Sequence, residues 1–108
     1  MSEIMLQLNF NFRVTKEEYE QAVSPLADKF ANVSGLKWKI WILNAEKSEA
    51  GGIYLFENQA SLDEFLAGQL AKTVTGHPAL SNFSVKQFAI MKDITEATRG
   101  PIKLSSNA

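Results

Sequence analysis

The sequence predicts a ferredoxin-like α+β fold, with a four-stranded antiparallel sheet and two helices on one of its faces. Three observations predict this fold. Some segments alternate strictly between apolar and other side chains, as strands do. Two segments combine a capping motif with an apolar stripe of helical spacing, and together these segments follow the order βαββαβ. The 108 residues suffice for one domain, which we assign to residues 1–94, followed by a partly disordered tail at residues 95–108.

The first strand is predicted at Ile4 to Phe12, where every second side chain is apolar. A period of two residues is typical of a strand with one buried face. We expect the apolar face to meet the helices, and Asn9 and Asn11 to lie on the opposite face.

The first helix is predicted to begin at Thr15, because Thr15 and Glu18 have the spacing of a capping box. An apolar stripe of helical spacing then continues to Phe30. Pro25 lies within this stripe and removes one backbone hydrogen bond. The helix therefore either kinks at Pro25 or restarts there with Ser24 as its cap.

The second strand is predicted at Leu36 to Leu43 and the third at Gly52 to Glu57, on either side of a polar loop that we expect to be a mobile lip. Alternation assigns one face of the second strand to the helices, namely Leu36, Trp38, Ile40 and Ile42. The opposite face then carries Lys37, Lys39, Trp41 and Leu43. The pair Gly51-Gly52 predicts a bulge or a close approach of two backbones.

A second capping box, Ser61 to Glu64, predicts a second helix that ends near Gly76. A fourth strand with weaker alternation is predicted at Phe83 to Met91. Asp93 to Arg99 can form one further helical turn before Gly100-Pro101 stops it.

Two helices on one face leave the other face of the sheet bare. We expect that face to carry Met5, Trp41 and Leu43, with Tyr54 and Phe56 as further candidates. Monomers rarely expose such an apolar surface. A second copy of the chain is its simplest cover, which predicts a symmetric homodimer.

The composition excludes several classes of protein. The net charge is −1 and the basic residues are scattered, so there is no basic stripe for nucleic acid. The chain has no cysteine for disulfides or thiolate metal sites, and one histidine cannot form a histidine-rich site. The first residues do not resemble a signal peptide, and no apolar stretch reaches the ~18 residues that span a bilayer. We therefore expect a soluble cytoplasmic protein with neither a membrane nor a nucleic-acid partner.

Four segments resemble the YdhR family of monooxygenases: Leu6 to Phe10, Pro25 to Ala27, Gly35 to Trp41 and Glu49 to Phe56. The elements run in the family's order as far as Ile94. The family is placed in the dimeric α+β barrel superfamily, beside the antibiotic-biosynthesis monooxygenases, so the resemblance implies a homodimer whose two sheets face each other. It also implies oxygenation of a small aromatic or quinol-like compound without a bound metal, flavin or haem.

Candidate catalytic residues are those that can move a proton or stabilise a phenolate. His77 is the only histidine, the side-chain type best suited to proton exchange near neutral pH. It is our candidate base, and a solvated loop residue is the simpler interpretation. Asn9 and Tyr54 are candidates to hydrogen-bond a substrate oxygen. The alternatives are cross-dimer or water-bridged pairing for Asn9, as for Asn11, and packing within the strand for Tyr54.

Candidate substrate-binding residues are the aromatic and polar side chains around the expected pocket: Trp38, Trp41, Phe10, Asn11, Arg13, Phe65 and Phe88. Each has a structural alternative. Trp38 can be plain core, Trp41 can anchor the dimer interface, and Arg13 can be solvated. The pocket can lie on the helix side of the sheet or at the dimer interface.

The function that we predict is a cofactor-independent monooxygenase that acts with molecular oxygen on a small aromatic or quinol-like compound. Two alternatives stay open. One is another enzyme of the barrel superfamily, such as an isomerase or a haem-degrading protein. The other is a non-catalytic dimeric module that binds a small molecule.

Overall fold

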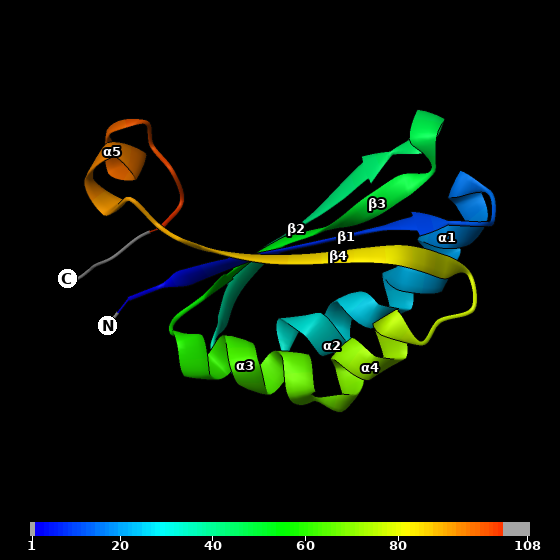
Figure 1. Ribbon diagram of the computed structural model, residues 1–108, viewed down its shortest axis with the longest axis horizontal. Helices are drawn as coiled ribbons and strands as arrows, with labels where there is room; N and C mark the ends of the chain where they lie inside the picture. Colours follow the sequence, from blue (N-terminus) through cyan, green and yellow to red (C-terminus); the bar gives the residue numbers. More distant parts are fainter. Residues whose placement is uncertain (1, 103–108) are drawn as a thin grey trace.

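The computed structural model describes residues 2–102 and shows a four-stranded antiparallel sheet with a layer of helices under one face (Figure 1). The strands are β1 (Ile4–Phe12), β2 (Leu36–Asn44), β3 (Glu49–Phe56) and β4 (Leu80–Ala89). Their order in the sheet is β2-β3-β1-β4. This βαββαβ arrangement is the predicted ferredoxin-like fold.

The first helical segment is broken at its proline. It consists of α1 (Lys16–Val23), a 3₁₀ turn η1 (Ser24–Leu26) and α2 (Ala27–Ala31). The predicted capping box is present: the Glu18 amide donates to the Thr15 hydroxyl oxygen at 3.1 Å, and the Thr15 amide donates to the Glu18 carboxylate at 3.0 Å. Pro25 lies in the 3₁₀ turn. The predicted alternatives were a kinked helix or a new α-helix that starts at Pro25, whereas the structure has this turn between two α-helices.

The second helical segment begins earlier than predicted. It comprises α3 (Gln59–Ala67) and α4 (Gln69–Thr75), separated at Gly68. Asn58 is the cap, because its side-chain oxygen accepts a hydrogen bond from the Ser61 amide at 2.9 Å. Ser61 therefore lies inside the helix, and the capping box predicted there is wrong.

The side chains of β2 lie on the faces opposite to those predicted for most of the strand. Leu36 pairs with Phe56, but the next pair is Trp38 with Leu55, so β2 has one extra residue at Lys37. Because strand side chains alternate, one extra residue transfers all later side chains to the other face. Trp38, Ile40 and Ile42 consequently lie away from the helices, while Lys39, Trp41 and Leu43 lie on the helix side.

The two tryptophans therefore exchange the places predicted for them. Trp38 Nε1 donates a hydrogen bond to the Pro101 carbonyl at 2.7 Å, on the face away from the helices. The Trp41 ring meets Phe30 of α2 edge-on, with ring centroids 5.3 Å apart and an interplanar angle of 82°. The interpretations of Trp38 as a wall of a helix-side pocket and of Trp41 as an anchor on the bare face are wrong.

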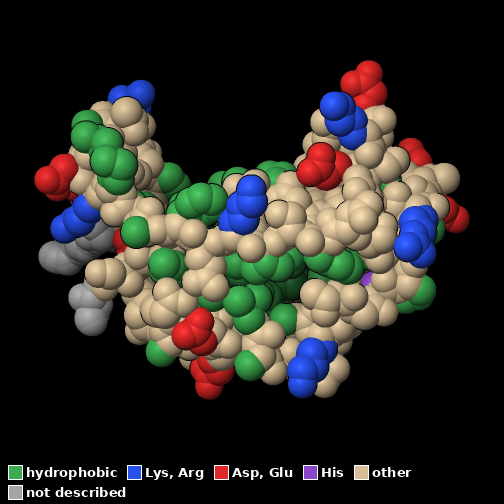
Figure 2. Space-filling model, in the orientation of Figure 1, with side chains coloured by type: hydrophobic (Ala, Val, Ile, Leu, Met, Phe, Trp, Pro, Cys, Tyr) green, Lys and Arg blue, Asp and Glu red, His purple; other side chains and the backbone are tan. Residues whose placement is uncertain are grey.

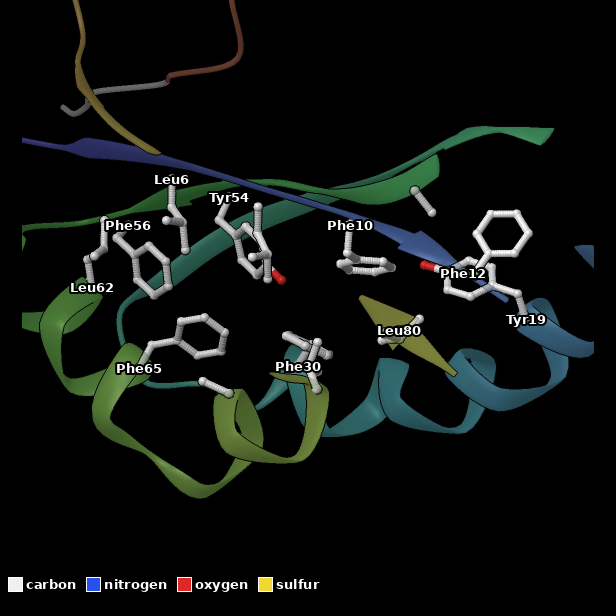
Figure 3. Packing of buried hydrophobic residues seen from close by; sticks show 14 residues of the cluster. Leu6, Phe10, Phe12, Tyr19, Phe30, Tyr54, Phe56, Leu62, Phe65 and Leu80 are labelled. Carbon is white, nitrogen blue, oxygen red and sulfur yellow. The ribbon is translucent and has the colours of Figure 1, made fainter. Parts of the chain in front are cut away.

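Tyr54 and Phe56 also lie on the helix side, so they are not part of the bare face. Tyr54 pairs with Leu6, a core residue of β1. The ring of Phe65 in α3 contacts the rings of Tyr54 and Phe56, at centroid distances of 5.3 Å and 5.6 Å. Figure 3 shows these side chains and Phe30 filling the space between the sheet and the helices. Aromatic rings thus dominate the core.

The turn between β2 and β3 is shorter than the predicted lip. The strands extend to Asn44 and from Glu49, leaving a single 3₁₀ turn η2 (Ala45–Lys47). Of the two alternatives for the glycine pair, the close approach is the one observed: a Cβ at Gly51 would collide with the Leu8 carbonyl, and the pairing with β1 continues through both glycines.

The chain after β4 lies on the face of the sheet away from α1–α4. It forms α5 (Lys92–Ala97), the predicted extra helical turn, and returns so that Ile102 is buried (Figure 1). Within residues 95–102 the end of the segment contacts the sheet, since Ile102 is buried and the Pro101 carbonyl accepts a hydrogen bond from Trp38. The disorder predicted for Ser105 to Ala108 concerns residues outside the described range. Among residues 2–102, no helix is long and apolar enough to cross a membrane.

The exchanged tryptophans lead to a test by fluorescence. We expect Ile102→Asp to displace the returning segment, because a buried apolar site cannot hold an unpaired charge. In a Trp41→Phe background, emission from Trp38 should then shift to longer wavelength, and the melting temperature should fall by roughly 10 °C. In a Trp38→Phe background, emission from Trp41 should stay unchanged. A shift confined to Trp41 would contradict the observed faces of β2.

Candidate functional site

A small cavity of about 30 Å³ lies between the sheet and the helix layer. This volume has room for water but is far below the roughly 300–1,000 Å³ of a small-molecule pocket. Its apolar wall includes Phe10, Phe30 and Trp41, and its polar groups come from Lys39, Tyr19, Tyr54, Thr73 and His77. Figure 2 shows hydrophobic side chains gathered in the hollow between sheet and helices. The site is therefore an aromatic enclosure with a few convergent polar groups.

Lys39 is the cation of this enclosure. Its Nζ lies 3.3 Å from the ring centroid of Trp41, 3.5 Å from that of Phe30 and 4.7 Å from that of Tyr54. The faces of aromatic rings attract an ammonium group. Burial disfavours the charge and lowers the pKa of Lys39 to about 7. The side chain therefore exchanges its proton near neutral pH.

The surroundings of Lys39 offer no compensating carboxylate. The ion pairs within residues 2–102 join Lys16 to Glu20 and Lys37 to Glu3, and neither involves Lys39. When a buried amine has no anionic partner, nothing offsets the loss of hydration, and its pKa stays below the ordinary value. An acidic ligand that entered the cavity would supply the missing partner.

Gly52 makes room for the lysine side chain. A Cβ at this position would lie 2.6 Å from Lys39 Cε and 3.1 Å from Tyr54 Cε1. Both distances are shorter than ordinary van der Waals contact. Glycine at position 52 thus allows the lysine to fold over the tyrosine ring.

The two tyrosines of the cavity are neutral hydrogen-bond donors. Burial raises the pKa of Tyr19 to about 12. Burial, with a smaller contribution from the charge of Tyr19, raises the pKa of Tyr54 still further. Both phenol groups therefore keep their protons at neutral pH and can donate to an anionic oxygen.

His77 lies in the loop after α4 and borders the cavity. Its Nδ1 accepts a hydrogen bond from the Ala79 amide at 3.1 Å. The proton of a neutral imidazole then lies on Nε2, an assignment that follows from this hydrogen bond. In this arrangement the ring can donate to a ligand but has no free lone pair.

The structure brings four of the predicted site residues together at the cavity and places six elsewhere. Those at the cavity are Phe10, Trp41, Tyr54 and His77. Phe65 lies deeper in the core, beside Tyr54. Arg13 is exposed at the end of β1, with Nη1 3.5 Å from the Pro78 carbonyl. Trp38, Phe88, Asn9 and Asn11 lie on the opposite face of the sheet, because they alternate with core residues of their strands.

Asn9 and Asn11 already have protein partners on that face. Asn9 Nδ2 donates to Glu49 at 3.3 Å, and Asn11 Nδ2 donates to the Ser48 carbonyl at 3.2 Å. Both bonds are direct and lie within one chain, so they differ from the cross-dimer or water-bridged pairing that was the alternative for these amides.

Lys39 and Tyr19 are the site residues that sequence reasoning missed. A signal for Lys39 was present, because it is a lysine between two tryptophans in an otherwise apolar strand. Strict alternation assigned it to the other face and concealed it. Within residues 2–102 there is no group of three or more His, Cys, Asp or Glu side chains that could hold a metal ion.

Trp41 separates the cavity from the surface. Its ring is 39% exposed and also borders an outer groove of about 380 Å³ between α1 and β2. Tyr19 and Val23 border both spaces. Movement of the Trp41 ring would therefore change the size of both spaces.

These features define an α+β protein of ferredoxin-like topology that encloses an aromatic cavity under its sheet. The chain belongs to the family described as "Putative mono-oxygenase ydhR", whose model matches residues 5–101. The predicted family is thus confirmed, and the match continues past Ile94, where the resemblance was expected to end. No curated protein sequence matches the chain.

Solved structures share this fold. SnoaB, a cofactor-independent oxygenase from Streptomyces nogalater, is 17% identical with a TM-score of 0.70, covering 85% of this chain and 96% of SnoaB. NE2512, a protein of unknown function from Nitrosomonas europaea, is 15% identical with a TM-score of 0.71, covering 84% and 91%. A dimeric ferredoxin-like protein of unknown function from Thermobifida fusca is 18% identical with a TM-score of 0.65, covering 82% and 92%.

The pKa of Lys39 leads to a prediction about stability. In the folded chain this pKa is about 7, below the ordinary value of 10.5. Between these values the unfolded chain binds a proton that the folded chain does not, so the free energy of unfolding should rise with pH from about 7 to 10. Above this range the trend should reverse, because the raised pKa values of Tyr19 and Tyr54 make the unfolded chain lose protons first.

Urea unfolding at a series of pH values measures this effect. Lys39→Met should remove the rise and should be more stable than the wild type below about pH 7. Lys47→Met, at an exposed position of the turn η2, should follow the wild type. A rise that persists in Lys39→Met would show that another group causes it.

Proposed function

We propose that this protein is a cofactor-independent monooxygenase that oxidises a small aromatic or quinol-like compound in the cavity between sheet and helices. The observation that carries the proposal is the aromatic enclosure itself, which combines ring-shaped walls with neutral tyrosine donors and a titratable amine. Membership of a monooxygenase family supports it. SnoaB, which shares the fold, is described as a cofactor-independent oxygenase.

In this reaction the substrate is its own reductant. An electron-rich phenol or anthrone loses a proton, and the resulting anion gives one electron to molecular oxygen. The two radicals combine to form a carbon–oxygen bond, and the peroxide loses water to leave a quinone. One oxygen atom enters the product and the other leaves as water, so an anthrone CH₂ becomes C=O with one O₂ consumed and one water released.

The protein has to exclude water, hold the ring and stabilise the phenolate. The aromatic walls serve the first two purposes. The Tyr54 hydroxyl points into the space between sheet and helices (Figure 3). With its pKa raised by burial, it stays protonated and can donate to the phenolate oxygen.

Two groups at the cavity can exchange the proton that starts the reaction, His77 and Lys39. His77 is the group that the sequence suggests. In the observed arrangement its Nδ1 is engaged by the Ala79 amide, so it acts as a base only after that bond breaks. Lys39 needs no such change.

The substrate has to enlarge the cavity. Pockets for small molecules usually measure roughly 300–1,000 Å³, whereas the closed cavity measures about 30 Å³ and the outer groove about 380 Å³. Rotation of the Trp41 ring joins the two spaces and exposes the substrate ring to Lys39. Trp41 thus serves both as a wall and as the entrance.

A homodimer is the second part of the proposal. The sheet face away from α1–α4 carries Ile40, Ile53 and Phe88 around the amides of Gln7 and Asn9, a mixed surface that a second copy can cover. The Thermobifida fusca protein of the same fold is described as dimeric. In such a dimer the two helix-side cavities face outward, so each protomer holds a complete site.

The activity is tested by oxygen uptake with a panel of hydroquinones and anthrones. We expect oxygen uptake that a chelator does not change, and one quinone formed per O₂ consumed. When the reaction is run under isotopically heavy O₂, one heavy oxygen atom should enter each product molecule. Trp41→Ala should lower kcat/KM at least about tenfold, since the lost ring both contacts the substrate and excludes water. Trp38→Ala, on the opposite face, should change it less than about twofold. Saturable ligand binding without oxygen uptake would contradict an enzymatic function.

The dimer is tested by a charge on the proposed interface. Ile40 is 49% exposed on the face away from the helices, and Leu43 is 41% exposed on the helix side of the same edge strand. Ile40→Asp should give a monomer by light scattering, because a buried unpaired charge disfavours association. Leu43→Asp should stay dimeric. The opposite pattern would place the interface on the helix side.

A further inference from the structure

We infer that Lys39 is the general base of this reaction: its uncharged amine takes the acidic proton of the bound phenol, and the rings of Phe30 and Trp41 then hold the ammonium beside the phenolate. The inference rests on the proposed function for the reaction and names the residue that starts it. Geometry carries it, because Nζ lies at the cavity and within 3.5 Å of both ring centroids.

The enclosure suits both charge states of the amine. Before the transfer, desolvation keeps a large fraction of Lys39 uncharged at neutral pH, since its pKa is about 7. After the transfer, the ring faces attract the ammonium, and the phenolate supplies an anionic partner, which residues 2–102 do not provide at this point. Ion pairs are stronger in such a poorly hydrated site than in water.

The proton transfer balances without any outside reagent. The substrate O–H or acidic C–H bond breaks, its electron pair stays on the substrate, and a new N–H bond forms on Lys39. The substrate anion then reduces oxygen as proposed above. When the peroxide breaks down, the O–O bond and the remaining C–H bond of the oxidised carbon break and a C=O bond forms. The departing oxygen takes that hydrogen and the proton from Lys39, leaves as water, and the amine is uncharged again.

The other titratable groups that face the cavity are less suited to this role. Tyr19 on α1 and Tyr54 on β3 keep their protons, because burial raises the pKa of each. His77 has its Nδ1 lone pair engaged by a backbone amide. Glu20 borders the outer groove and not the cavity, and it is paired with Lys16.

The position of the amine is set by two elements of the fold. The extra residue in β2 turns Lys39 toward the helices, and Gly52 leaves the space through which its side chain passes. Gly52→Ala should therefore displace the amine without removing it. Gly52 is a positioning residue in this scheme, and its variant should change the pH dependence of the reaction as well as its rate.

The first test needs no turnover. 4-Nitrophenol is titrated into the protein at about pH 6, where the free compound is mostly un-ionised. We expect the long-wavelength band of the phenolate to appear with the wild type, because the bound anion pairs with the Lys39 ammonium. Lys39→Met should bind the phenol without this band, a change of at least about tenfold in the ionised fraction. Lys39→Arg, which keeps a cation, should restore the band.

The pH dependence of turnover then shows whether Lys39 acts as a base or only provides a positive charge. In the wild type, kcat/KM should rise with pH through about 7, the pKa of Lys39. Lys39→Arg should lose this rise together with most of the rate, because a guanidinium does not give up its proton. His77→Gln should keep the rise, and so should the exposed control Lys47→Met. Circular dichroism of each variant verifies that it is folded.

Two results would overturn the inference. One is a phenolate band of equal strength in folded Lys39→Met and wild type. The other is oxygen uptake by Lys39→Met with the pH dependence of the wild type, which leaves the proposed monooxygenase intact but removes Lys39 as its base. A wild type that ionises the bound phenol through Lys39 but takes up no oxygen with any substrate would instead contradict the proposed function and support the amine site.

Discussion

One extra residue in β2 determines which side chains of this strand face the space between the sheet and the helices. The added residue at Lys37 shifts the pairing with β3, so that every later side chain of the edge strand changes face. Lys39 and Trp41 thereby enter the space between sheet and helices. Without the shift, strict alternation would place Trp38, Ile40 and Ile42 on the helix side, and the cavity would hold no titratable amine from this strand.

The aromatic core both stabilises the fold and sets the properties of Lys39. The rings of Phe30, Tyr54 and Phe65 pack against one another with centroids 5.3 to 5.9 Å apart, and the truncation of one such ring typically costs about 3–5 kcal/mol. Phe30 and Tyr54 also lie beside the amine of Lys39, whose pKa is lowered by burial. A charged group in this place reduces stability at neutral pH, which is a common property of functional sites.

The two faces of the sheet have separate tasks. The helix side encloses the cavity, whereas the other side carries α5, the returning segment at Ile102 and an apolar surface with amides at its centre. Trp38 fastens the returning segment by its hydrogen bond to Pro101. Because β1 and β3 contribute alternate side chains to both faces, a change in their pairing would alter the cavity and the proposed dimer surface together.

The sequence by itself determined the elements, their order and the family, because those signals are local: alternation in β1 and the capping box at Thr15 depend on neighbouring residues. It also pointed to His77 and Tyr54, which do border the cavity. It could not assign Trp38 and Trp41 to faces, because a bulge depends on the partner strand and leaves no mark in the alternation. Only the tertiary structure decided that Lys39 lies among aromatic rings, since its desolvation comes from residues distant in the chain.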